Sequence, residues 1–115
     1  MNKVTDAKIL KSCLGQSQSL AALVNYSEDS IVSKTLLDKP TGTLTLFAFA
    51  AGQQLSEHTS PYDASVQILD GTAEVAIDGK CMHVASGELI VMPAHIPHSV
   101  KAQVNFKMLL IMIRD

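Results

Sequence analysis

Two stretches decide the fold of this chain: GQQLSEHTS at residues 52–60 and GELIVMPAHIPH at residues 87–98. In the first, His58 follows a glycine at a spacing of six positions. In the second, His98 closes a run that contains a glycine and a proline. The interpretation of function depends on whether these two histidines make a site together.

Around these stretches, turn-forming residues recur at short intervals. They occur at residues 28–30, 38–42, 51–52, 70–71, 78–79 and 86–87. Closely spaced turns between short apolar runs predict an all-β barrel or sandwich. Asp78-Gly79 predicts a hairpin, because this pair readily adopts the two positive φ angles of a type I′ turn. Residues 1–19 carry weak helical signals and are expected to form an N-terminal arm, with residues 20–115 as a single barrel domain.

Two predicted strands are apolar on both faces. Residues 43–49 begin by alternating and then become apolar throughout, and residues 106–113 do the same. A strand of this kind needs cover on its outer face as well as on its inner one. We expect the cover to come from a second subunit or from the N-terminal arm.

The spacing of the glycines, prolines and histidines resembles the signature of the cupin superfamily. That signature reads G-x5-H-x-H-x3-4-E-x6-G, followed by G-x5-P-x-G-x2-H, and its two halves correspond here to residues 52–71 and 87–98. The outer histidines match, whereas Ser60 stands at the second histidine and Ala64 at the glutamate. The resemblance implies an antiparallel jelly-roll β-barrel, commonly dimeric, with half of the family's metal ligands missing.

The resemblance also implies that His58 and His98 lie side by side in the mouth of the barrel. Residues two apart on a strand face the same way, so His58, Ser60 and Ala64 are expected on the inner face. Two imidazoles hold a divalent ion weakly, and a catalytic site usually has three protein ligands. His95, which replaces a glycine of the signature, is the first candidate for a third ligand, and Asp63 is the second.

Three functions follow from this arrangement. The first is a metal centre of His58, His98 and His95 that holds Zn, Fe, Ni, Cu or Mn, without an organic cofactor, and acts on a small polar molecule. The second is a metal-free barrel that binds or senses a small molecule, with Ser60 among its polar anchors. The third is acid/base chemistry in which a histidine acts with Tyr62. The sequence leaves open whether there is catalysis, and it assigns no catalytic residue.

Composition excludes several other classes of protein. The net charge of −2 and the lack of tryptophan give no basic, stacking surface for nucleic acid. The N-terminus has no apolar signal core and no apolar run is long enough to span a bilayer, so we expect a cytoplasmic protein without a membrane role. Cys13 and Cys81 are expected to be reduced thiols. A hydrophobic content of 47% favours a homodimer.

Overall fold

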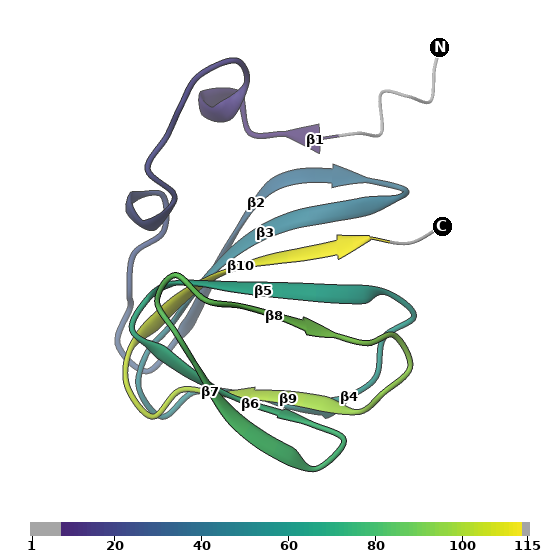
Figure 1. The fold of residues 1–115 in the computed structure, drawn as a ribbon. Helices are drawn as coiled ribbons and strands as arrows, with labels where there is room; N and C mark the ends of the chain where they lie inside the picture. Colours follow the sequence, from purple (N-terminus) through teal and green to yellow (C-terminus); the bar gives the residue numbers. More distant parts are fainter. Residues whose placement is uncertain (1–7, 114–115) are drawn as a thin grey trace.

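The structure is a computed structural model that describes residues 8–113, and these residues form two stacked antiparallel sheets (Figure 1). The strands are β1 (Lys8–Ile9), β2 (Ile31–Lys39), β3 (Gly42–Phe49), β4 (Gln54–His58), β5 (Asp63–Asp70), β6 (Thr72–Ile77), β7 (Lys80–Ala85), β8 (Leu89–Met92), β9 (His98–Lys101) and β10 (Phe106–Ile113). The prediction of an antiparallel jelly-roll barrel is confirmed.

The chain crosses repeatedly between the two sheets. One sheet has the order β1-β2-β3-β10-β5-β8 and the other has the order β4-β9-β6-β7. From β3 onward the chain passes to β4, returns to β5, passes to the β6–β7 hairpin, and so on until β10. These crossings bring β4 and β9, which are far apart in the sequence, together as neighbours in the smaller sheet.

The inner core fills the space between the sheets. Its largest side chains include Phe49 and Phe106, which are fully buried and stack with their ring centroids 4.5 Å apart. Along β10 the even-numbered residues such as Met108 face this core, whereas Leu109 faces a second core on the other side. Alternation along the strand therefore explains why β10 has two apolar faces.

The second core lies between the larger sheet and the N-terminal arm, which Figure 1 shows on the side away from the smaller sheet. Leu10 of the arm packs against buried residues of β2, β3 and β10, as do Leu20 and Leu23 of the segment that links the arm to β2. The ammonium group of Lys107 donates to the carbonyl oxygen of Ala21 at 2.6 Å and holds this linking segment against β10. Of the two covers that the sequence allowed, the described structure shows the arm, together with residues 20–24, which were predicted to belong to the barrel domain.

The arm contains little regular structure. In the described residues before β2, the helices are two 3-10 turns, η2 (Lys11–Cys13) in the arm and η3 (Leu20–Ala22) just after it, and the long strands of the barrel begin at Ile31. Among the described residues, no helix is long and apolar enough to cross a membrane. The arm owes its position to packing and side-chain bonds, since helices this short have little stability of their own.

Two turns show why particular residues are needed. Asp78 and Gly79 have φ angles of 51° and 81°, so the predicted type I′ hairpin between β6 and β7 is confirmed. Gly71 has a φ angle of 73°, and a Cβ atom there would collide with the carbonyl oxygen of Asn105. Only glycine combines that angle with so close an approach of two backbone segments.

Candidate functional site

His58 and His98 lie together where the two sheets meet at one end of the barrel. His58 is the last residue of β4, His98 is the first of β9, and the two residues are paired across the strands. Their ring centroids are 4.4 Å apart and the ring planes meet at 69°. His98 is buried, with 4% of its surface exposed, whereas His58 is exposed. The pair therefore joins the interior of the barrel to solvent.

A β-bulge turns His58 into the barrel. Leu55 pairs with Val100 and His58 pairs with His98, so three residue steps on β4 oppose two steps on β9. In a regular strand, residues three apart face opposite ways, and His58 would then point away from the face that carries Leu55. The extra residue of the bulge puts both side chains on the inner face.

The two imidazoles hold the same tautomer. Nδ1 of His58 lies 2.7 Å from the carbonyl oxygen of Ser56, and Nδ1 of His98 lies 3.1 Å from that of Ile96. A carbonyl oxygen only accepts hydrogen bonds, so each Nδ1 carries the proton and donates. In the neutral rings Nε2 is therefore an acceptor, free to receive a hydrogen bond or to bind a metal ion.

The pair borders a small cavity of about 50 Å³. The residues that line it are Leu55, His58, Ser60, Ala64, Met92, His98, Val100, Met108, Leu110 and Met112. Sites for drug-sized ligands measure about 300–1,000 Å³, whereas one water needs only about 10–15 Å³. The enclosed part of the site therefore has room for a few non-hydrogen atoms.

Comparison with other proteins agrees with this architecture. A family model described as "Cupin domain" matches residues 45–114, which is more than half of the chain. The chain belongs to the cupin family. The sequence and the structure thus both show a cupin-fold barrel. Membership of this family supports small-molecule binding of unknown specificity.

Solved structures are similar over most of this cupin. A conserved protein of unknown function from Streptococcus pyogenes is 39% identical, with a TM-score of 0.83 over 87% of this chain and 88% of that one. A cupin superfamily protein from Desulfitobacterium hafniense is 29% identical, with a TM-score of 0.83 over 87% and 92% of the two chains.

A cupin 2 conserved barrel domain protein from Leptotrichia buccalis is 45% identical, with a TM-score of 0.80. The match covers 82% of this cupin but 46% of that chain, so the present chain spans about half of that protein's length. No curated protein sequence matches.

The residues at the mouth do not fit a divalent centre with three or four protein ligands. Where the signature has its second histidine, the Ser60 hydroxyl accepts a hydrogen bond from the amide of Tyr62 at 3.0 Å. Where it has its glutamate, the methyl group of Ala64 is buried. Within residues 8–113, no three His, Cys, Asp or Glu side chains are grouped closely enough to hold an ion.

His95 lies in the turn after β8, where it is exposed. Its φ angle of 67° is in the left-handed region, which explains why the signature has glycine at this position. Its amide donates to the carbonyl oxygen of Ser60 at 2.8 Å, so its backbone ties this turn to the mouth. The described side chains that line the cavity do not include His95 or Tyr62.

Asp63 also binds this turn. Its Oδ1 atom accepts a hydrogen bond from the amide of Ala94 at 2.9 Å, and its side chain is exposed. The bulge that would be needed to turn Asp63 inward is not found here, because the register between β5 and β10 shifts at Lys107 instead. Asp63 thus supports the turn in front of His98.

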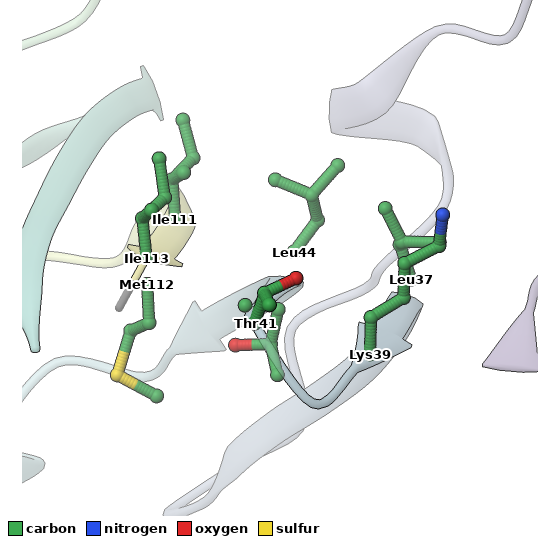
Figure 2. A pocket seen from close by; sticks show the side chains of 9 residues that line it. Leu37, Lys39, Thr41, Leu44, Ile111, Met112 and Ile113 are labelled. Atoms are coloured by element: carbon green, nitrogen blue, oxygen red, sulfur yellow. The ribbon is translucent and has the colours of Figure 1, made fainter. Parts of the chain in front are cut away.

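The remaining reactive groups lie away from the mouth. Cys81 is exposed, and desolvation together with the nearby Glu74 carboxylate raises the pKa of its thiol, which is the reverse of activation. His83 is exposed, with Nε2 3.7 Å from the same carboxylate. A larger groove of about 280 Å³, with mostly apolar walls, lies between the ends of β2, β3 and β10. Figure 2 shows side chains that line it.

Proposed function

We propose that this cupin binds a small polar molecule in the mouth cavity without a metal ion. The observation that carries the proposal is the shared tautomer of His58 and His98, which leaves Nε2 of each ring as an acceptor in two residues that line the same cavity. The other walls are mostly apolar, as in ordinary small-molecule sites, where a few polar groups fix orientation. The pair is the polar end of such a site.

The geometry favours a particular kind of ligand. Neutral imidazoles accept hydrogen bonds through Nε2, so the ligand presents a hydroxyl group or a protonated acid. The cavity of about 50 Å³ takes only the small end of the molecule, and the rest extends past the exposed His58. Small alcohols, phenols and carboxylic acids are therefore the first compounds to test.

Thermal unfolding in the presence of a chelator tests this proposal. A ligand at a hundred times its Kd stabilises the folded state by about 2.7 kcal/mol. With an unfolding entropy of about 2.1 cal/mol/K per residue, this corresponds to a rise in Tm of about 11 °C for 115 residues. The rise should disappear in His58→Ala and His98→Gln, each checked for native circular dichroism.

The matched control is His83→Ala, because His83 is an exposed histidine on β7 outside the cavity. This variant should keep the full ligand-induced rise. A rise of equal size in His98→Gln, or no stabilising compound in any of the three chemical classes, would count against the proposal.

A second candidate is the divalent transition-metal centre that the sequence suggests. It is supported by the Nδ1 bonds to Ser56 and Ile96, since metal-binding histidines usually donate their other ring N–H to a carbonyl or carboxylate. Here His58 and His98 would hold Zn, Fe, Ni, Cu or Mn, and water or substrate would fill the open positions. His95 would join them only if its turn rearranged.

Elemental analysis after loading with each of these ions tests the second candidate. Near-stoichiometric metal in the natural chain, and its loss from the His58→Ala/His98→Ala variant, is the expected result. His95→Gly separates the two-histidine centre from the three-histidine one. If neither the natural chain nor the double variant retains metal after loading, the candidate is contradicted.

We also propose that the chain forms a homodimer. Support comes from β8, an edge strand of the larger sheet on which Leu89 is 58% exposed and Val91 is 51% exposed. Apolar side chains on an open edge favour pairing with another chain. Light scattering should give twice the mass of one chain, and Val91→Lys should lower it.

A further inference from the structure

Methionine is concentrated at the mouth cavity. Met92, Met108 and Met112 all line it beside the two imidazoles, whereas Met82 lies exposed on β7. Thioethers are soft, neutral ligands that favour Cu(I) over hard ions. The cavity thus combines two kinds of neutral donor, nitrogen and sulfur.

The sheet register sets two of these methionines on either side of Ala64. Ala64 pairs with Met92 of β8 and with Met112 of β10, so the three residues form one row across the inner face. Strand spacing puts the outer two Cα atoms about 10 Å apart. Because Ala64 has only a methyl group, space is left over it into which both flexible thioethers can reach.

The orientation of Met112 is consistent with this row. In Figure 2, its side chain projects from β10 on the side opposite to Ile111 and Ile113. Those isoleucines have odd numbers and face the outer side of the sheet, whereas Met112 packs against the inner core with Met108. The Met112 thioether therefore belongs to the inner row.

Charge also favours a monovalent ion. The donors that line the cavity are neutral, and no carboxylate or thiolate is among the described side chains that line it. An ion held there keeps its full charge beside apolar walls, where uncompensated charge is costly, and the cost rises steeply with the size of the charge. A single positive charge is therefore tolerated better than two.

We infer that the mouth cavity selects Cu(I), bound by Nε2 of His58 and His98 and by the thioethers of Met92 and Met112. This inference rests on the second candidate function, since it needs the two histidines to bind an ion. It replaces the divalent ion of that candidate with Cu(I) and adds two sulfur ligands to the two histidines.

The test is an anaerobic competition between the protein and a colorimetric Cu(I) chelator, with Ag(I) as a redox-inert probe and Zn(II) for comparison. Cu(I) and Ag(I) should bind at least tenfold more tightly than Zn(II). The Met92→Leu/Met112→Leu variant should lose at least tenfold in Cu(I) affinity and keep its Zn(II) affinity. Leucine has nearly the volume of methionine, so this variant should fold.

Matched controls are available on one strand. Met82→Leu and His83→Ala alter an exposed methionine and an exposed histidine of β7, and both should bind Cu(I) as the natural chain does. X-ray absorption of the copper-loaded protein should show sulfur scatterers that disappear in the Met92→Leu/Met112→Leu variant.

The outcomes separate this inference from the proposed functions. If Zn(II) binds through the histidines and Cu(I) is no tighter, or if the leucine variant binds Cu(I) unchanged, the inference is overturned and the divalent centre stands. If no ion binds while small molecules stabilise the protein in the presence of a chelator, both the Cu(I) site and the divalent centre are refuted and the metal-free function is supported.

Discussion

Replacing His95 by glycine distinguishes a turn residue from a metal ligand. His95 has a φ angle of 67°, where an L-residue pays about 1–2 kcal/mol relative to a right-handed conformation. Glycine avoids that cost but loses about 0.5–1 kcal/mol through its greater freedom in the unfolded chain. The net expectation for His95→Gly is a stabilisation of about 0.5–1 kcal/mol.

The expected size of the thermal shift follows from the length of the chain. At about 2.1 cal/mol/K per residue, unfolding 115 residues has an entropy of about 0.24 kcal/mol/K. His95→Gly should therefore raise Tm by about 2–4 °C in scans followed by circular dichroism. The hydrogen bond from residue 95 to the carbonyl oxygen of Ser60 is made by the backbone, so glycine keeps it.

The same variant should retain whatever ion or small molecule the mouth binds, because His95 does not line the cavity. A His95→Ala variant is the matched control: it removes the imidazole but keeps the backbone strain, so its Tm should stay near that of the natural chain. A lower Tm for His95→Gly would refute the strain argument. Loss of bound metal in both variants would show that the imidazole is a ligand.

Three further predictions concern stability. Gly71→Ala forces a methyl group onto the carbonyl oxygen of Asn105 at a positive φ angle, and should lower the free energy of unfolding in urea by about 2–4 kcal/mol. A loss below 1 kcal/mol would show that the two backbone segments do not approach so closely. Phe49→Ala removes one of two stacked, fully buried rings and should cost about 3–5 kcal/mol by the same assay, whereas a small loss would mean that the core collapses around the gap. Burial, followed by the hydrogen bond to Asp70, raises the pKa of Tyr26 above its ordinary value of 10.0. The stabilisation that this shift gives the folded state is therefore complete below pH 10 and is lost as the pH rises further. Tyr26→Phe should remove this part of the alkaline destabilisation, and identical profiles of stability against pH for the two proteins would contradict the prediction.

Much of the fold could be predicted because its signals are local. The Asp78-Gly79 turn needs only two residues with positive φ angles, and the structure has both. The apolar outer faces of β3 and β10 correctly indicated that something covers them. The position of the covering segment depends on side chains far away in the sequence, such as Lys107, which donates a hydrogen bond to Ala21. In the described residues 8–19, the helical signals correspond to one 3-10 turn, η2, since tertiary packing outweighs weak propensity.

The site was harder to predict because it depends on register. His58, Ser60 and Ala64 all line the cavity, as predicted, but strand alternation does not place them there: β4 ends at His58, and Ala64 lies on β5 in the other sheet. The methionines that line the cavity have no local sequence signal, because flexible core filling is the ordinary role of methionine. Only the pairing of Ala64 with both Met92 and Met112 brings two thioethers to the same row.

The bulge in β4 could not be predicted from local periodicity, because contacts with β9 and with the residue after it fix both ends of the strand. At one end the amide of Ala102 donates to the carbonyl oxygen of Gln53 at 2.9 Å, and at the other end His58 pairs with His98. Between these points β4 has one residue more than β9, so the ladder has to bulge. Alternation alone would set His58 on the face opposite to Leu55, and the orientation of the histidine thus follows from closure of the barrel rather than from the pattern of its own strand.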